Sequence, residues 1–216
     1  MPYRRTERVE ARLAGNRQRI LRTARQLMAE GGFREARVTA IAAAAGVATG
    51  TIYRYFPSKA ELFAEVLRVI CQRELDVVSA IADSGGPARD RLAAAVRAFT
   101  SRALRGRRLA YTIIVEPVDP EVDEVRLEYR RAQGRVFESI IADGIGAGEF
   151  PPQNVKASAA CLVGAFLEGL VGPLGQDAGV DDEAGRSLIE AIVGFALRAV
   201  SGGEIAREQA RRAAFP

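Results

Sequence analysis

Residues 38–63 read VTAIAAAAGVATGTIYRYFPSKAELF, and this stretch decides the fold of the N-terminal part of the chain. Its first half predicts a short helix over residues 38–45, which Gly46 closes. Its second half predicts another helix of about two turns over residues 49–56. Pro57 ends that helix because proline cannot continue it. The stretch therefore contains two short helices joined by a tight turn.

A preceding helix completes this N-terminal unit. Apolar residues recur at helical spacing from Asn16, a suitable N-cap, to the Gly31-Gly32 pair that ends the helix. After the two short helices, Ser58 and Glu61 form a capping box that begins a long fourth helix. Three helices within the first 56 residues, the second and third of them short, predict a helix-turn-helix.

The second short helix is predicted to have a buried and an exposed face. Ile52 and Phe56 would fill the core, which leaves Tyr53, Arg54 and small Thr and Gly side chains facing outward. Small residues at a helix start allow close approach to a DNA major groove, where Arg54 is the expected base reader. The tyrosines and Lys59 are expected to reach phosphates. The full set of expected DNA-contacting residues is Thr39, Thr49, Gly50, Thr51, Tyr53, Arg54, Tyr55 and Lys59. The alternative is an ordinary helical hairpin whose tyrosines are half-buried packing residues.

The same stretch resembles the DNA-binding signature of the tetracycline-repressor (TetR) family of bacterial transcription regulators, and the likeness covers residues 16–63. Two positions depart from the family pattern, since Arg37 replaces a helix-capping Ser or Thr and Ala48 replaces a Ser. Thr39 could supply the first missing hydroxyl. The resemblance implies a homodimer that binds a double-stranded DNA operator, with a C-terminal domain that binds a small molecule and dimerises through its last two helices. The matching positions are Ile41, Ala42, Ala45, Gly46, Val47, Gly50, Thr51, Ile52, Tyr53, Tyr55, Phe56, Ser58, Lys59 and Leu62.

The composition excludes several classes of protein. The chain has 216 residues, of which 48% are hydrophobic and 27% charged, a balance typical of a globular protein that buries a core without disulfides. It contains no histidine, which removes Ser-His-Asp and Cys-His nucleophile systems and every His-containing zinc site. We expect no enzyme activity, no cofactor and no metal site.

Charge and cysteine usage indicate a cytoplasmic DNA-binding protein. Residues 1–70 hold 13 Lys and Arg against 6 Glu, a net charge of +7, whereas residues 71–216 carry a net charge of −3. The basic end is the candidate nucleic-acid surface, and the alternative is a solvated arginine-rich terminus. Cys71 and Cys161 lack CxxC spacing, and no secretory signal precedes them. The longest apolar run stops at Glu168, too early for a membrane-spanning helix, so we expect no membrane partner.

The remainder of the chain is predicted to be helical throughout. Residues 109–116 suit a strand by propensity, but nothing offers a pairing partner, and we interpret them as a short buried helix. The expected fold is all-α, with about nine helices in a three-helix helix-turn-helix domain and a larger C-terminal helical domain. The other expected helices cover residues 58–83, 88–104, 119–143, 154–171 and 181–200. The expected division is a flexible arm (1–15), a DNA-binding domain (16–62), a ligand-binding and dimerisation domain (63–200) and a flexible tail (201–216).

Two helices near the C-terminus offer a face for dimerisation. Small residues recur at a spacing of four along residues 157–169, which lets helices approach closely. The last helix adds larger apolar residues. The expected interface residues are Ala157, Cys161, Ala165, Gly169, Ile192 and Phe195. The same face could equally be the core of the monomer.

A ligand pocket is expected among the helices between residues 63 and 171, where apolar walls would surround a few polar groups. Glu116 stands in an apolar segment and needs a partner, either Arg126 or Arg130 of the protein or a cationic ligand. For each candidate the alternative is an ordinary core aromatic or a surface acid. The candidate pocket residues are Tyr111, Ile114, Glu116, Tyr129, Phe137 and Phe166.

The sequence thus predicts a ligand-responsive transcriptional regulator, with a repressor as the leading interpretation. A small-molecule effector would release it from a palindromic operator. The rival hypothesis is a helical ligand-binding protein or enzyme whose helix-turn-helix is incidental. A third hypothesis is sequence-independent DNA binding through arginine, which would show a steep salt dependence but little preference between sequences.

Overall fold

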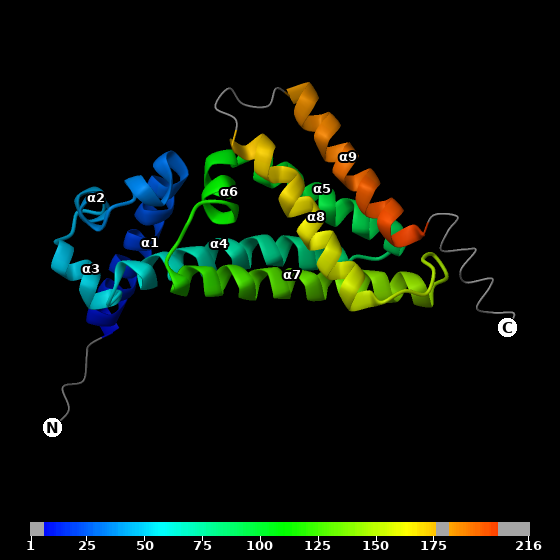
Figure 1. The fold of residues 1–216 in the computed structure, drawn as a ribbon. Helices are drawn as coiled ribbons and strands as arrows, with labels where there is room; N and C mark the ends of the chain where they lie inside the picture. The colour runs from blue at the N-terminus through cyan, green and yellow to red at the C-terminus, as the bar shows by residue number, and fades with distance from the viewer. Residues whose placement is uncertain (1–6, 176–181, 203–216) are drawn as a thin grey trace, which may run out of the picture.

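Nine helices and no strand make up the part of the chain that the computed structural model describes, residues 7–175 and 182–202 (Figure 1). The all-α prediction is confirmed. In chain order the helices are α1 (Glu7–Glu35), α2 (Val38–Ala44), α3 (Thr49–Tyr55), α4 (Lys59–Ala82), α5 (Ala88–Arg105), α6 (Arg107–Ile114), α7 (Pro120–Gly146), α8 (Val155–Gly175) and α9 (Asp182–Ser201).

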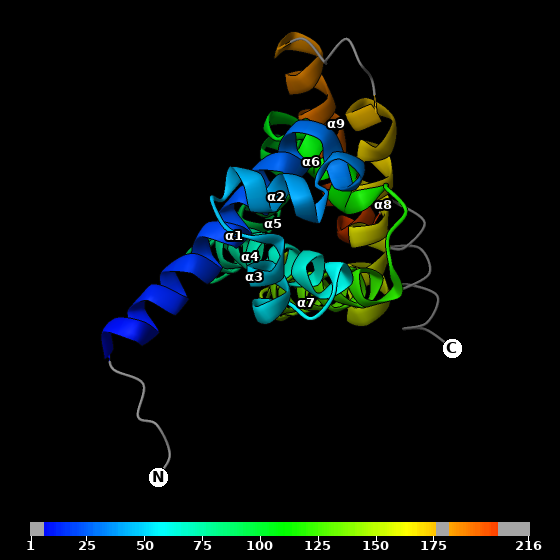
Figure 2. The same cartoon turned by 90° about the vertical axis from the view of Figure 1, so that its left-hand side faces the viewer.

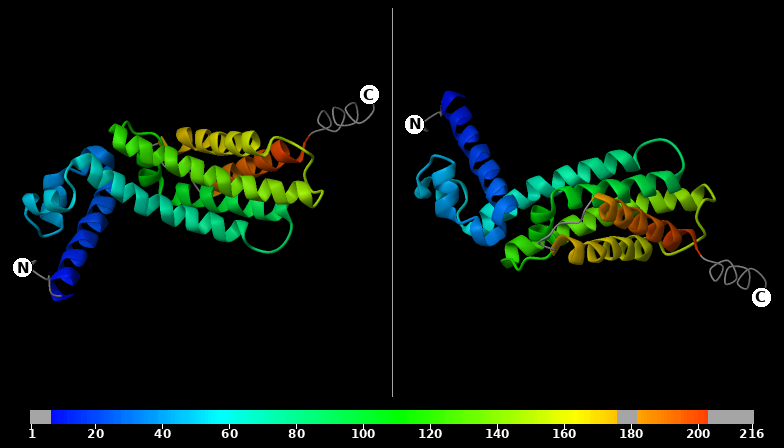
Figure 3. Two further views of the ribbon diagram at one scale, coloured as in Figure 1. Left: turned by 90° about the horizontal axis from the view of Figure 1, so that it is seen from below. Right: turned by 90° about the horizontal axis from the view of Figure 1, so that it is seen from above.

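The helices form two parts that α4 joins. Helices α1–α3 gather at one end of the molecule, which Figure 2 shows end-on. From there α4 and α7 run side by side along the length of the molecule, and α5, α6, α8 and α9 pack over that pair (Figure 3). The long helices α4 and α7 therefore connect the helix-turn-helix mechanically to the larger bundle.

The three N-terminal helices share one hydrophobic core with the starts of α4 and α7. Ile20, Ala24 and Met28 form a fully buried stripe of α1 that packs in one cluster with Ile52 of α3. Gly46 turns the chain between α2 and α3 at a φ of 63°, a conformation that suits glycine. The cluster extends into α4 and α7 through Leu62, Phe63, Val66, Leu67, Ile70, Cys71, Val122 and Val125. No flexible linker separates the two parts, since α4 belongs to both.

A second core fills the bundle of α4 to α9. Its centre is a group of three phenylalanines in which Phe99 of α5 and Phe137 of α7 both pack against Phe166 of α8. The ring centroids lie 5.1 Å and 5.6 Å apart, within the range of favourable aromatic contacts.

The first helix starts earlier than the sequence pattern predicts. We expected it to begin at Asn16, but α1 begins at Glu7, so the predicted arm of residues 1–15 is largely helical. This segment lacks an apolar stripe, yet it is rich in good helix formers and has Glu7 and Glu10 near its N-terminus, where negative charge favours a helix. Residues 1–6 and 203–216, which include most of the predicted tail, lie outside the described residues.

Two other helices differ in detail from the prediction. The segment interpreted as a short buried helix is a helix, but it begins at Arg107, and Thr112 is its one fully buried residue. Its apolar side chains are only partly buried because several of them line a cavity. Helix α7 runs further than expected, through Gly144, and the chain then turns at Gly148 with a φ of 73°.

Candidate nucleic-acid interface and ligand cavity

The exposed face of α3 carries the side chains that we expect to meet DNA. Tyr53 is 47% exposed, and Gly50 and Arg54 are also exposed. The two threonines of the helix are half-buried. Ile52 is 1% exposed and anchors the opposite face in the core. The predicted division of α3 into a core face and an outward face therefore agrees with the structure.

Tyr55 does not lie as expected. Its hydroxyl is buried and has no hydrogen-bond partner in the structure, so it is not placed to reach a phosphate. The reason is helical spacing, because Tyr55 follows Ile52 by three residues and shares its side of α3. Lys59 and Thr39 are both exposed. Both residues remain candidate DNA contacts.

The caps of the short helices reflect the departures from the family pattern. Neither Arg37 before α2 nor Ala48 before α3 provides a side-chain cap, and Thr39 does not replace the missing hydroxyl. Ser58, by contrast, caps α4 as predicted, since its hydroxyl accepts a hydrogen bond from the backbone N–H of Glu61 at 3.0 Å. Of the helices α2, α3 and α4, only α4 has a side-chain N-cap, and α4 leads into the larger bundle.

A network of hydrogen bonds joins the end of α1 to α6. The carboxylate of Glu116, which is 16% exposed, accepts a hydrogen bond from the backbone N–H of Phe33 at 3.0 Å. It also pairs with Arg108 at 2.8 Å. Arg108 in turn donates to the carbonyl of Gly31 at 2.9 Å. The expectation that the Glu116 carboxylate pairs with Arg126, Arg130 or a cationic ligand is therefore wrong, because Arg108 and a backbone N–H already satisfy it.

Gly32 lies inside this network. Its backbone has a φ of 74° and a ψ of −168°, a region that is essentially restricted to glycine. A Cβ atom on Gly32 would collide with Arg108 and with the Glu116 carboxylate. Gly32 therefore interrupts the helical conformation within α1 and lets α6 approach α1 closely enough for the network to form.

Arg126 extends the network to α7. Its guanidinium donates to the backbone carbonyls of Thr112 at 2.7 Å and Glu116 at 2.8 Å, which fixes the end of α6 against α7. Arg126 is 8% exposed, and this burial lowers its pKa. We call the connected set Phe33, Arg108, Glu116 and Arg126 the α1–α6 junction.

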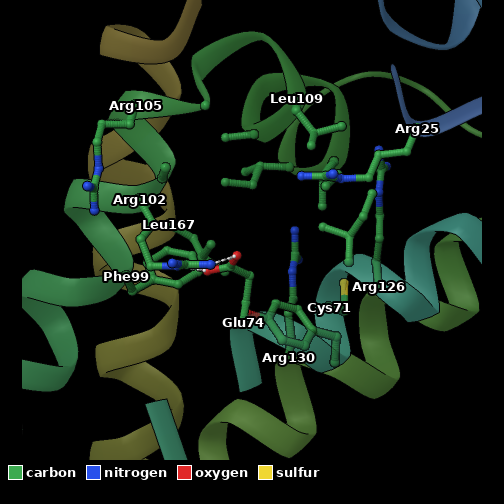
Figure 4. A pocket seen from close by; sticks show the side chains of 17 residues that line it. Arg25, Cys71, Glu74, Phe99, Arg102, Arg105, Leu109, Arg126, Arg130 and Leu167 are labelled. Atoms are coloured by element: carbon green, nitrogen blue, oxygen red, sulfur yellow. Dashed lines mark hydrogen bonds and ion pairs between the residues drawn. The ribbon is translucent and has the colours of Figure 1, made fainter. Parts of the chain in front are cut away.

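A cavity of about 310 Å³ lies beside the junction, where α4 to α8 meet (Figure 4). This volume lies within the usual range for small-molecule sites. One basic residue of α1, Arg25, also lines the cavity, so the N-terminal helices contribute directly to its wall. Its apolar lining includes Ile70, Phe99, Leu109, Ile113, Ile114 and Leu167.

The six predicted pocket residues fall in four places. Ile114 and Tyr129 line the cavity. Glu116 belongs to the α1–α6 junction, and Tyr111 is partly buried near Arg108, outside the cavity lining. The other two predicted residues, Phe137 and Phe166, belong to the second core. The hydrophobic pattern did not distinguish cavity walls from core because both are apolar.

The sequence pattern does not reveal the basic residues of the cavity. Arg25 was not among the predicted pocket residues, and Arg130 was considered only as a partner for Glu116. Both are exposed. The packing of α1 against α6 brings Arg25 to the cavity, and the packing of α7 against α4 and α8 brings Arg130 there. No charge imbalance in the sequence indicates them, because residues 102–130 hold six arginines and six acidic residues.

The predicted dimer residues divide into exposed and buried ones. Ala157, Cys161 and Gly169 of α8 are exposed, and Phe195 of α9 is 49% exposed. Ala165 is half-buried. Ile192 differs, because it is buried within the single chain and packs next to Gly169. Helix α8 is also long and apolar enough to cross a membrane by length and composition, a weak indication that many core helices share.

The two cysteines have different environments. Burial raises the pKa of the Cys71 thiol to about 12, so this thiol stays protonated and unreactive at neutral pH. Cys161 is exposed on α8. Among the residues that the structure describes, no group of three or more Cys, Asp or Glu side chains is arranged to hold a metal ion.

Two family models match the chain. One, described as bacterial regulatory proteins of the tetR family, matches residues 20–66, which hold α2, α3 and parts of α1 and α4. The other, described as a tetracyclin repressor-like C-terminal domain, matches residues 85–167, from before α5 into α8. The two matches thus cover both the candidate DNA-contact surface and most of the helices around the cavity.

Individual proteins of known name are also similar. The HTH-type transcriptional repressor KstR of Mycolicibacterium smegmatis is 28% identical over 180 residues, which span 79% of this chain and 82% of KstR. The crystal structure of FadR from Bacillus subtilis with stearoyl-CoA has a TM-score of 0.73 at 20% identity and covers 85% of this chain and 98% of FadR. RolR in complex with resorcinol has a TM-score of 0.68 at 20% identity and covers 92% of this chain and 94% of RolR.

Proposed function

The chain belongs to the TetR family of bacterial regulatory proteins, and we propose that it is a cytoplasmic, dimeric transcriptional repressor that a small molecule releases from a palindromic operator. The observation that carries this proposal is the α1–α6 junction. Through it, the helix that supports the DNA-contact surface is hydrogen-bonded to the helix that lines the cavity. The cavity is assigned to sensing a ligand rather than to catalysing a reaction.

The junction suggests how a ligand in the cavity acts on DNA binding. Leu109 and Ile113 of α6 line the cavity, and Glu116 just beyond α6 holds the end of α1. A ligand that displaces α6 would therefore move α1 together with α2 and α3. Two recognition helices fit successive major grooves only when they lie roughly 34–36 Å apart. A ligand that favours a different spacing lowers operator affinity by its differential binding to the two states.

A second copy of this chain is the proposed occupant of the exposed α8 and α9 face. Ala157, Cys161 and Gly169 leave a shallow apolar surface on α8, and Phe195 projects from the neighbouring helix α9. Small residues permit close helix packing across a two-fold axis, and an exposed phenylalanine gains free energy when a partner covers it. This face also holds the two recognition helices at a fixed separation in the proposed dimer.

Cys161→Arg should dissociate the dimer. The substitution places two unpaired charges in the proposed interface, one from each copy, and burying such charges costs several kcal/mol. We expect the dimer dissociation constant, measured by analytical ultracentrifugation, to rise by at least about a hundredfold. Ala80→Arg is the matched control, because Ala80 is exposed on α4, away from this face. If both variants dimerise as the unmodified chain does, the α8 and α9 face is not the interface.

Arg54→Ala should weaken the preference for the operator over other DNA. A guanidinium that reads a base contributes about 1–3 kcal/mol of discrimination, which corresponds to roughly a five- to 150-fold loss of specificity. The measurement is a competition titration of operator against shuffled DNA of equal composition at about 150 mM salt. Arg186→Ala, which removes an exposed arginine from α9, should leave the preference unchanged. An Arg54→Ala protein with the full preference would contradict the proposed role of α3.

The bound molecules of the two structural relatives do not identify the effector. FadR was crystallised with stearoyl-CoA and RolR with resorcinol, and these molecules differ greatly in size and charge. The shared fold thus accommodates unlike ligands. The chemistry of the effector has to be inferred from the residues that line this cavity.

A further inference from the structure

The side chains around the cavity carry a large excess of positive charge. Five arginines line it against one acid, Glu74. Glu74 is fully used by Arg102, which donates two hydrogen bonds of 2.7 Å to its two carboxylate oxygens. The remaining lining arginines are Arg25, Arg105, Arg126 and Arg130. None of these four has a carboxylate from the cavity lining as its partner.

Two of the four arginines have no partner at all in the described part of the chain. Arg126 is occupied by the carbonyls of Thr112 and Glu116, and Arg105 donates to its own helix. Arg25 and Arg130 make neither an ion pair nor a hydrogen bond there. Figure 4 shows their side chains extending into the same space, from α1 and from α7. Two guanidinium groups that share one cavity repel each other, and a bound anion would remove that repulsion.

The rest of the lining favours an apolar body with little further polarity. Aliphatic and aromatic side chains from α4, α5, α6 and α8 supply most of the wall. The hydroxyl of Tyr129 is buried without a hydrogen-bond partner, so one donor remains free for a ligand oxygen. Burial also raises the pKa of Tyr129, which keeps that hydroxyl protonated. The volume of about 310 Å³ equals roughly ten water-sized groups, enough for a medium-length chain or a compact ring system.

We propose that the effector is an amphipathic organic anion, whose carboxylate or phosphate binds between Arg25 and Arg130 while its apolar part lies against Phe99, Ile113 and Leu167. Because Arg25 belongs to α1 and Arg130 to α7, the anion bridges the DNA-binding helices and the larger bundle. This inference rests on the proposed function for its regulatory meaning. It is tested without DNA, so a failure to bind ligand and a failure to bind an operator are separate results.

The test is isothermal titration calorimetry of the full chain with four ten-carbon probes that differ only in their head group. These are decanoate, decyl phosphate, decanol and decylammonium. We expect both anions to bind at least about tenfold more tightly than decanol, and decylammonium to bind most weakly. If decanoate binds more tightly than decyl phosphate, the effector's head group is a carboxylate; the reverse order indicates a phosphate.

The variants Arg25→Gln and Arg130→Gln test whether these two arginines bind the anionic head group. Each substitution should weaken binding of the preferred anion by about tenfold and leave binding of decanol unchanged. Arg186→Gln removes the same charge from α9, outside the cavity, and should leave anion binding unchanged. Circular dichroism of each variant checks that it is folded. Three results would each overturn the proposal. They are equal affinity for decanol and the anions, undiminished anion binding by a protein that carries both Arg25→Gln and Arg130→Gln, and no binding of any probe.

Discussion

Replacing Phe137 by alanine should lower the free energy of unfolding by about 3–5 kcal/mol, the range for removing a large aromatic side chain from a packed core. Phe137 is 0% exposed, and its ring packs on Phe166 with a centroid distance of 5.6 Å. Three long helices surround this point, so they cannot collapse fully into the space that the ring leaves. The expected result is a marked decrease in the midpoint of chemical denaturation.

A matched aromatic substitution at the surface provides the control. Tyr53 is 47% exposed on α3, and Tyr53→Ala should change the free energy of unfolding by less than about 0.5 kcal/mol. The pair also separates two roles for Phe137. A Phe137→Ala protein that is as stable as the unmodified chain but has lost ligand affinity would make Phe137 a cavity wall, as the sequence suggested, and not a core residue.

Gly32→Ala should destabilise the chain by at least about 2 kcal/mol and weaken the connection between α1 and α6. The backbone at Gly32 has a φ of 74° and a ψ of −168°, which alanine adopts only with strain. The added methyl group would also collide with Arg108 and Glu116, so their ion pair would have to open. Thermal denaturation measures the first effect, and ligand-induced release of operator DNA measures the second.

Gly134→Ala is the control for this prediction. Gly134 lies within α7, where an added Cβ would meet no other atom within 4 Å. Alanine there should stabilise the helix by about 0.5–1 kcal/mol, since glycine is a poor helix former. Unchanged stability and an unchanged response to ligand in Gly32→Ala would show that the junction does not connect the cavity to the DNA-contact surface.

The features that the sequence predicts well are those with a local cause. The turn at Gly46, the end of a helix at Pro57 and the cap at Ser58 each depend on a few neighbouring residues, and the structure has all three. The buried position of Ile52 follows from helical spacing alone. Such signals were sufficient to recognise the helix-turn-helix and to locate most of the later helices.

The features that the sequence did not predict depend on contacts between distant segments. Glu116 was recognised as needing a partner, but its partners Arg108 and the Phe33 backbone come together only when α6 packs on α1. Arg25 joins the cavity for the same reason. Tyr55 was assigned to phosphate contact from its residue type, although helical spacing places its hydroxyl toward the core. The spacing of apolar residues identifies the face of a helix that is buried, but it does not identify the helix that packs against that face.

Selection of binding sites from random-sequence duplex DNA tests the central claim most directly. The purified chain is incubated with the pool at about 150 mM salt, and the bound fraction is sequenced after several rounds. We predict a two-fold symmetric motif with half-sites about one helical turn apart or a multiple of it, bound roughly 10³-fold or more above shuffled DNA. A pool that stays featureless would contradict sequence-specific DNA binding, and with it the assignment of this chain as a repressor.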